Sequence, residues 1–370
     1  MMLNNVEDYA RIRVVGVGGG GSNAVDRMIE AGVMGVEYVA VNTDLQVLDL
    51  SAADKKLQIG EKLTGGLGTG GDPDLGRQAG EESRQEILMS LDDSDMVFIT
   101  SGMGGGTGTG ASPIIAEIAR ELDALTVGIV TKPFAVEGRR RGEVADEGLK
   151  RLKEQVDALI VIPNDRLIEL SDEDLTLREA FSLADQILHQ GVRGISEVIV
   201  VPGLVNLDFA DVRSVMKGAG TAMMSIGEAS GENRAAEAAN MAIDSPLLET
   251  NIKGANALLV NITGGPDLSL REVQEAARLI QEAAQGEGDN ADMTLGAVID
   301  EQLEGTLRLT VVATGFDEGP SRRPSARRWA TDVEEPSENN GASSPGAAFQ
   351  EELPTYDEND LDIPAFLRRH

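Results

Sequence analysis

Residues 96–110 read MVFITSGMGGGTGTG, an apolar run followed directly by a loop with six glycines in nine positions. The apolar run, Met96–Thr100, predicts a buried strand. Glycine loses more conformational entropy on folding than any other residue, so such a loop is unfavourable unless something must pack against bare backbone. Thr107 and Thr109 add hydroxyl groups at the same place. We therefore interpret the segment as a strand that ends in an anion-binding loop.

A second glycine loop lies near the N-terminus, where residues 16–23 read GVGGGGSN. It follows the apolar run Arg11–Val15 and precedes a helix-like stretch, so Gly16, Gly18 and Gly21 match G-x-G-x-x-G in the required context. A helix N-terminus offers unpaired N–H groups and partial positive charge to a phosphate. The alternative is a tight turn that binds nothing. Two such openings at one sheet edge indicate a long polyphosphate held from two sides.

A third glycine cluster occupies residues 65–71 and reads GGLGTGG. It follows the second predicted strand, so it either covers the phosphates or forms a mobile surface loop. The pattern G-x-x-x-x-G-K-[ST] is absent, and no P-loop lysine is therefore available. The phosphate charge would have to be balanced by backbone dipoles, by a bound Mg²⁺ or by the cluster Arg139–Arg141. By itself, such an arginine cluster is more typical of a solvated face.

The first half of the chain, residues 11–174, repeats an apolar run, a turn and a helix-like stretch. The runs are continuously apolar, as is typical of parallel strands covered on both faces. Strands alternating with helices predict an α/β fold with a Rossmann-like parallel sheet, whose ligand lies at the carboxyl ends of the strands. The predicted strands are Arg11–Val15, Glu37–Val41, Met96–Thr100, Thr126–Thr131 and Ala158–Ile162.

Two further units follow. Helical periodicity predicts a long connecting helix within residues 175–203, although Val198–Val201 could instead form a strand. Residues 204–316 predict a second α+β domain, with a capping box over Ser269–Glu272 that opens a helix. Its predicted strands are Ala257–Thr263, Thr294–Ile299 and Thr306–Ala313.

The ends of the chain differ from the rest in composition. Residues 1–10 form a short extension, and residues 317–359 form an acidic, proline-rich linker that we expect to be disordered. Residues 360–370 end the chain, where Ile363, Phe366 and Leu367 recur at helical spacing. This tip is either a partner-docking peptide or an idle terminus.

Composition excludes several classes of function for this chain of 370 residues. The net charge of −31 argues against nucleic acid as a partner. The absence of cysteine and the presence of only two histidines argue against Cys/His zinc sites and Ser-His-Asp catalysis. The longest strongly apolar run, Val198–Val205, is shorter than the ~18 residues that span a bilayer. We expect a cytoplasmic protein without direct membrane insertion.

An acidic segment, Leu204–Val212, carries the remaining candidate chemistry. Asn206, Asp208 and Asp211 could polarise a water molecule. Alternatively, Asp208 is a helix N-cap and Asp211 faces the helix dipole from the first turn. Spacing alone does not decide between these interpretations.

Together, the motifs resemble those of the FtsZ family, the bacterial cell-division GTPases of the tubulin superfamily. The likeness rests on GVGGGGSNAV at 16–25, NTD at 42–44, GGGTGTG at 104–110, IPND at 162–165 and NLDFAD at 206–211. It implies binding of GTP and GDP with Mg²⁺, and head-to-tail filaments in the division ring. DIPAFLRR at 362–369 resembles the family's partner-binding peptide, which implies membrane-tethering and regulatory partners for Leu361–Arg369.

The resemblance also implies roles for single residues. Glu137 and Arg141 would contact the ribose, Asn164 and Asp185 would read the guanine, and Phe181 would stack near it. Asn206, Asp208 and Asp211 would activate the hydrolytic water, whereas the Mg²⁺ ligands stay unassigned. The phosphates would lie among Gly19, Gly20, Gly21, Ser22, Asn23, Gly104, Gly105, Gly106, Thr107, Gly108 and Thr109.

The length of the predicted connecting helix bears on catalysis. It would hold Asp208 on the order of 30 Å from the nucleotide of its own subunit. A carboxylate must come within one water of the phosphate to act, so Asp208 would serve the site of a neighbour stacked head to tail. Such a contact builds an open filament if its rotation does not close. Two other classes stay open: an NAD oxidoreductase with Glu37 or Asp44 on the ribose, and a binding module switched by nucleotide.

Overall fold

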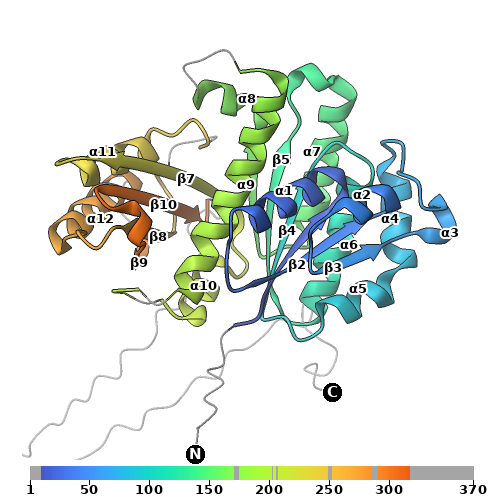
Figure 1. Ribbon diagram of the computed structural model, residues 1–370, viewed down its shortest axis with the longest axis horizontal. Coiled ribbons are helices and arrows are strands. Elements are labelled where there is room, and N and C mark those ends of the chain that lie inside the picture. The colour runs from blue at the N-terminus through green and yellow to red at the C-terminus, as the bar shows by residue number, and fades with distance from the viewer. Residues whose placement is uncertain are drawn as a thin grey trace, which may run out of the picture. The chain divides into compact units, whose positions relative to one another are not determined.

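The computed structural model describes residues 10–170, 175–201, 203–205, 207–248, 252–285 and 291–316 (Figure 1). The expectations for the N-terminal extension before Ala10, the linker, the tip at Leu361–Arg369 and Asn206 lie outside these residues. No helix in the described ranges is both long enough and apolar enough to cross a membrane.

The strands of the N-terminal half are all parallel and carry the buried apolar runs, which confirms the predicted α/β sheet. One strand escaped prediction, because the sequence of Lys55–Gln58, KKLQ, contains no apolar run. In spatial order the strands are β3 (Lys55–Gln58), β2 (Val36–Asn42), β1 (Ile12–Val17), β4 (Met96–Gly102), β5 (Leu125–Lys132) and β6 (Ala158–Pro163).

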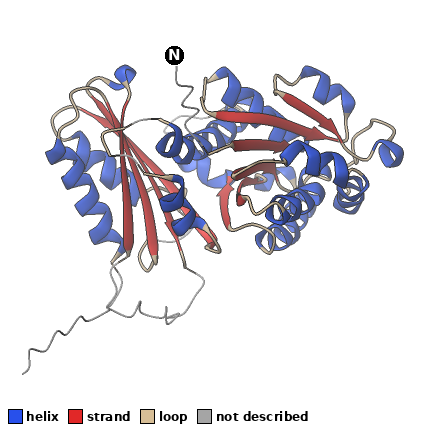
Figure 2. Ribbon diagram, turned by 90° about the horizontal axis from the view of Figure 1, so that it is seen from below, coloured by secondary structure: helices blue, strands red, loops and turns tan. Residues whose placement is uncertain are grey.

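Helices cover both faces of this sheet (Figure 2). One face packs against α1 (Gly18–Glu30), α2 (Leu45–Leu50), α9 (Leu177–Val200) and α10 (Phe209–Met216). The other face packs against α4 (Pro73–Glu82), α5 (Arg84–Leu91), α6 (Thr107–Glu121) and α7 (Arg139–Lys153). Short turns complete the N-terminal half: α3 (Glu61–Thr64), α8 (Asn164–Leu167), and the 3-10 segments Ala135–Glu137 and Ile168–Leu170.

The C-terminal half continues the same sheet. Strand β7 pairs with β6 in parallel over only Ala158–Ile160, and β7, β10 and β8 then pair antiparallel. The strand β7 was not predicted, since its small residues and glycines do not form an apolar run. The elements are β7 (Gly220–Ser230), α11 (Arg234–Ile243), β8 (Ala257–Gly264), α12 (Leu270–Ala284), β9 (Asp292–Ile299), the 3-10 segment Glu301–Leu303 and β10 (Thr306–Thr314).

Helix α9 lies between the two halves (Figure 1). It begins with a capping box between Thr176 and Glu179 and continues unbroken to Val200, so the alternative of a strand at 198–201 is wrong. Gly194 lies where a Cβ would be 2.6 Å from Cγ2 of Thr310 on β10. The glycine therefore lets the helix approach the C-terminal sheet closely.

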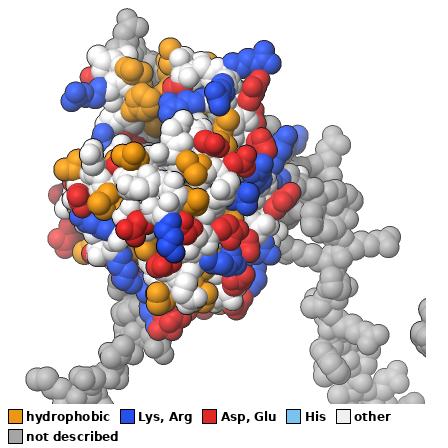
Figure 3. Space-filling model, turned by 90° about the vertical axis from the view of Figure 1, so that its right-hand side faces the viewer, with side chains coloured by type: hydrophobic (Ala, Val, Ile, Leu, Met, Phe, Trp, Pro, Cys, Tyr) orange, Lys and Arg blue, Asp and Glu red, His pale blue; other side chains and the backbone are white. Residues whose placement is uncertain are grey.

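The outer face over α3, α4 and α5 carries acidic and basic side chains side by side, with hydrophobic ones scattered among them (Figure 3). Such mixing is typical of a solvated surface. The cavity that glycine backbone lines opens elsewhere, at the carboxyl ends of the strands.

Candidate functional site

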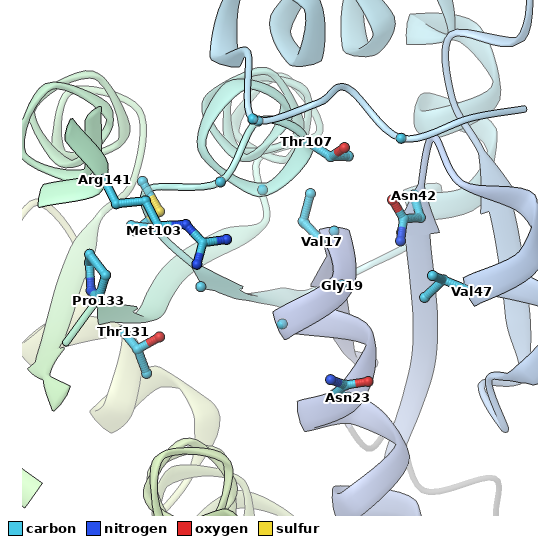
Figure 4. A pocket seen from close by; sticks show the side chains of 18 of the residues that line it. Val17, Gly19, Asn23, Asn42, Val47, Met103, Thr107, Thr131, Pro133 and Arg141 are labelled. Carbon is cyan, nitrogen blue, oxygen red and sulfur yellow. The ribbon is translucent and has the colours of Figure 1, made fainter. Parts of the chain in front are cut away.

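A cavity of about 570 Å³ opens at the carboxyl ends of β1, β4 and β5, where Val17, Gly102 and Thr131 line it (Figure 4). Its volume falls within the roughly 300–1,000 Å³ that small-molecule sites occupy. Its position matches the rule that ligands of open α/β sheets bind beyond the carboxyl ends of the strands.

The first glycine loop forms the first turn of α1, which begins at Gly18 directly after β1. Gly18 has a φ of +71°, and a Cβ there would lie 2.9 Å from the backbone nitrogen of Gly108, so the two glycine loops touch. Gly19, Gly20 and Asn23 line the cavity. The lining does not include Gly21 and Ser22, which are buried beneath it.

The second glycine loop ends where α6 begins at Thr107, and Gly105, Gly106, Thr107 and Gly108 line the cavity. The lining does not include Gly104 and Thr109. Instead, the backbone N–H of Gly104 donates to Oγ1 of Thr109 at 2.8 Å, which shapes the loop from behind.

The third glycine cluster lies over the second. Gly68, Thr69, Gly70 and Gly71 line the cavity, so this segment covers it. The hydroxyl of Thr107 is 2.9 Å from that of Thr43 and 3.3 Å from that of Thr69. Three loops thus meet at one buried threonine.

The two helices that begin at the cavity share a feature. Neither the N-cap of α1, Val17, nor that of α6, Gly106, provides a side-chain hydrogen bond to the first turn. Asp72 caps α4 and Thr176 caps α9 with their side chains, whereas α5, α7 and α11 also begin without a side-chain cap. The first N–H groups of a helix have no intrahelical partner. At α1 and α6 these donors are available to an anion in the cavity.

The other end of the cavity is lined by side chains rather than by glycine backbone. Phe181, near the start of α9, makes an edge-to-face contact with Phe134, with ring centroids 5.3 Å apart. Glu137 accepts from Nη1 of Arg141 at 2.5 Å and from the backbone N–H of Phe134 at 2.9 Å. Asn164 is 4% exposed, and its Oδ1 has no hydrogen-bond partner among the described residues.

Asp185 lines the cavity from the third turn of α9, with its side chain 15% exposed. Burial raises the pKa of this carboxyl to about 6, and the neighbouring Arg27 guanidinium opposes that rise. The ion pair joins Nε of Arg27 to Oδ2 of Asp185 at 2.9 Å. The structure therefore brings Asp185, Phe181, Asn164, Glu137 and Arg141 together.

Several lining residues were not among the predicted site residues. Asn42 ends strand β2 and Asp44 follows it, and the NTD motif at 42–44 was their signal, because polar residues at the carboxyl end of a buried parallel strand lie at the ligand edge. Gly68, Thr69, Gly70 and Gly71 belong to the third glycine cluster, for which a cover over the ligand was one of the two predicted alternatives. The remaining ones are Val17, Gly18, Val47, Gly102, Met103, Thr131, Pro133, Ala184 and Leu188, most of them small or apolar residues.

The acidic segment lies away from the cavity. Asp208 and Asp211 do not line it, and α10, which they open, lies at the end of α9 opposite α8 (Figure 1). Asp208 Oδ1 accepts from the backbone N–H of Asp211 at 2.8 Å, and Asp211 Oδ2 accepts from that of Asp208 at 3.2 Å. The predicted alternative of a helix cap is thus realised. Both side chains are nevertheless exposed.

The segment before α10 is attached to β9. The backbone N–H of Leu204 donates to the carbonyl of Ala297 at 2.8 Å, and that of Ala297 donates to the carbonyl of Val205 at 3.1 Å. Within the described ranges, no group of three or more His, Cys, Asp or Glu is placed to hold a metal ion.

Comparisons with known proteins agree on one family. Residues 11–172 match the GTPase domain of the Tubulin/FtsZ family, and residues 220–317 match the C-terminal domain of the FtsZ family. Two structures of FtsZ from M. jannaschii, an empty dimer and a point mutant, are each 48% identical with a TM-score of 0.79. They cover 83% of this chain, which in turn covers 89% and 91% of theirs.

A more distant structure shares the fold. CetZ2 from Haloferax volcanii, a GTPγS-bound protofilament, is 23% identical with a TM-score of 0.69, covering 82% of this chain and 92% of its own. The matched family models describe a GTPase, so the NAD oxidoreductase interpretation is not supported.

Proposed function

Because this chain belongs to the FtsZ family of GTPases, we propose that it completes its hydrolytic site only where two copies meet head to tail in a filament. The observation that supports this proposal is the separation of the cavity from Asp208 and Asp211 along α9. Residues of α9 as far as Leu188 line the cavity, whereas the acidic segment follows its far end.

The separation is too large for catalysis within one subunit. From Asp185 to the end of α9 at Val200, a helix extends about 22 Å at 1.5 Å per residue. A general base must lie within hydrogen-bond reach of the attacking water. Asp208 therefore acts on the nucleotide of a neighbour, with Asp211 and with Asn206, which lies outside the described residues.

Exposed apolar side chains at both ends support this contact. Leu67 and Val136 lie beside cavity-lining residues, and they are 68% and 80% exposed. Leu204, beside the acidic segment, is 68% exposed. A contact between unlike ends is heterologous and generates an open filament when its rotation does not close. The M. jannaschii structure is a dimer and the CetZ2 structure a protofilament.

The end of the cavity that glycine backbone lines binds the phosphates, and the end that side chains line binds the nucleoside. The uncapped first turns of α1 and α6 and the glycine backbone hold the phosphates and stabilise charge on the transferred phosphoryl group. Phe181 stacks on the base, and Asn164 and Asp185 read its edge. The unpartnered Oδ1 of Asn164 supports this assignment, because buried polar atoms are nearly always hydrogen-bonded. Glu137 and Arg141 contact the ribose.

A Mg²⁺ ion is compatible with a cavity that provides few carboxylates. It binds readily to substrate phosphates with only one or two protein carboxylates, and the cavity lining offers Asp44 near the third glycine loop. When bound, the ion would supply charge neutralisation of the triphosphate. Its ligands stay unassigned.

The cellular role follows from the family. We infer a cytoplasmic protein of the division ring, held at the membrane by tethering and regulatory partners that bind Leu361–Arg369. That segment lies outside the described residues, so the inference rests on its sequence alone.

The test separates the carboxylate of Asp208 from its capping role. Serine is as good an N-cap as aspartate but has no carboxylate. We expect Asp208→Ser and Asp211→Ala to bind GTP and assemble normally, while phosphate release falls by roughly 10²-fold or more. Nucleotide content, light scattering and phosphate release would be measured together.

The control is Ser269→Ala, which removes the N-cap of α12 and concerns a residue that belongs neither to the cavity lining nor to the acidic segment. It should lower stability by about 1 kcal/mol and leave phosphate release unchanged. If Asp208→Ser assembled and released phosphate at the normal rate, Asp208 would be a cap and nothing more.

A further inference from the structure

Arg27 connects the helix of the first glycine loop to the part of α9 that faces the base. It belongs to the last turn of α1, nine residues after the start of that helix at Gly18. Its Nε lies 2.9 Å from Oδ2 of Asp185, and its Nη1 donates to Oγ of Ser182 at 2.7 Å. The guanidinium does not line the cavity, so it contacts Asp185 from outside.

We propose that Arg27 is a positioning residue for base recognition, which orients the Asp185 carboxylate toward the base and thereby sets the preference for guanine. The proposal rests on the assignment of the cavity to GTP and GDP. Ser182 and Asp185 are three residues apart on α9, so one guanidinium holds two neighbouring positions of the same helix face. Phe181 lies four residues before Asp185, one turn earlier on the same face of α9.

The chemistry of guanine explains why orientation matters. Its N1–H and 2-amino group are adjacent donors, and an ionised carboxylate provides two acceptor oxygens. Hypoxanthine, the base of inosine, lacks the 2-amino group. A site that is built to accept from a particular donor rejects the analogue that lacks it, but only if the acceptor is held in place. Arg27 occupies one side of Oδ2 and limits the rotation of the carboxylate.

The charge of Asp185 depends on the same contact. Burial raises the pKa of the carboxyl to about 6, and Arg27 is the cation that opposes this. The other charged side chains that line the cavity are Asp44, Glu137 and Arg141, and the last two pair with each other. Guanine needs the ionised carboxylate, so affinity falls as the pH decreases through the pKa. Without Arg27 the pKa rises further, and the loss of affinity begins at a higher pH.

The experiment measures binding of GDP and of inosine diphosphate to the full chain, at protein concentrations below assembly, between pH 5.5 and 8.5. In Arg27→Met, we expect the preference for GDP over inosine diphosphate to fall by roughly tenfold or more, since a hydrogen bond to a charged group is lost. The midpoint of the pH dependence of GDP binding should move upward. Inosine diphosphate, which keeps N1–H but lacks the 2-amino group, should be weakened less than GDP.

Two further variants keep the test interpretable. Arg27→Lys retains the charge but not the two-pronged geometry, so it should restore the pH profile and only part of the base preference. Ser182→Ala removes one of the two anchors and should weaken the preference to a smaller degree. Arg278→Met, which removes an exposed arginine paired with Glu282 on α12, is the matched control and should change neither property.

Equal weakening of both nucleotides in Arg27→Met, with an unchanged pH profile, would overturn the proposal and leave Arg27 with a structural role. The same conclusion follows if Arg27→Lys and Ser182→Ala keep the full preference where Arg27→Met does not fold. If the wild-type protein itself did not prefer GDP, the assignment of the cavity would fail instead, so the two failures are distinguishable.

Discussion

Gly19 and Gly142 are both helical glycines with no atom within 4 Å of an added Cβ, yet they differ in what they face. Gly19 lies in the first turn of α1 and lines the cavity. Gly142 lies in the first turn of α7, and the cavity lining does not include it. The pair therefore separates the effect of alanine on a helix from its effect on the ligand.

Both Gly19→Ala and Gly142→Ala should stabilise the nucleotide-free protein, by up to about 1 kcal/mol in a helix interior and less in a first turn. Only Gly19→Ala should weaken GDP binding, by roughly tenfold or more, because its methyl group occupies space where phosphate must approach backbone N–H groups. Thermal unfolding without nucleotide and GDP titration would measure the two effects. Unchanged GDP affinity in Gly19→Ala would place the phosphates elsewhere.

The same contrast explains how much of the site the sequence could predict. The glycines of the two loops could be predicted from their type, which a ligand or a close approach favours, whereas Asn164 and Asp185 were predicted only through the family resemblance. Leu188 and Val47 also line the cavity, but as ordinary apolar residues they are indistinguishable from core. Arg27 was missed because its role depends on α1 and α9 lying side by side, which no local pattern encodes.

Helix α9 is the element on which the account depends, and two glycines set its distance from the C-terminal sheet. A Cβ at Gly194 would lie 2.6 Å from Cγ2 and 3.0 Å from Oγ1 of Thr310, a short side chain on a strand. A Cβ at Gly191 would lie 3.1 Å from the sulfur and the terminal carbon of Met224, which is flexible. The two positions should therefore respond differently to the same substitution.

We expect Gly194→Ala to destabilise the protein by about 1–2 kcal/mol, because overpacking outweighs the gain in helix propensity. Gly191→Ala should cost less, since the methionine can move aside. Thermal unfolding of the nucleotide-free protein would compare them, and Thr310→Ala combined with Gly194→Ala should recover part of the loss. A Gly194→Ala protein as stable as wild type would show that the helix does not rest on Thr310.

Elements with strong patterns were predicted well. The capping box follows from the spacing of Ser269 and Glu272, and the inner face of α12 follows from apolar residues at helical spacing. The parallel strands follow from continuous apolar runs. β3 was missed because it is an edge strand without a fully buried residue, and β7 because its sequence mixes small, polar and apolar residues instead of forming an apolar run. Pro113 lies inside α6, which begins six residues earlier, at Thr107.

On the scale of the whole molecule, the proposed mechanism requires that the nucleotide cavity and the catalytic carboxylates of one working site belong to different subunits. Asn164 of α8 and the first half of α9 line the cavity, whereas Asp208 is the N-cap of α10. Helices α8 and α10 lie at opposite ends of α9 (Figure 1). The length of the connecting helix predicted this separation from the sequence, and the unbroken helix Leu177–Val200 agrees with it.

The most direct measurement is the rate of phosphate release per subunit as a function of protein concentration, with light scattering recorded in parallel. We predict negligible release while the protein is dilute and unassembled, and release that rises in proportion to the assembled fraction once scattering appears. A rate per subunit that stayed constant from dilute protein without scattering up to the assembled state would contradict catalysis between subunits.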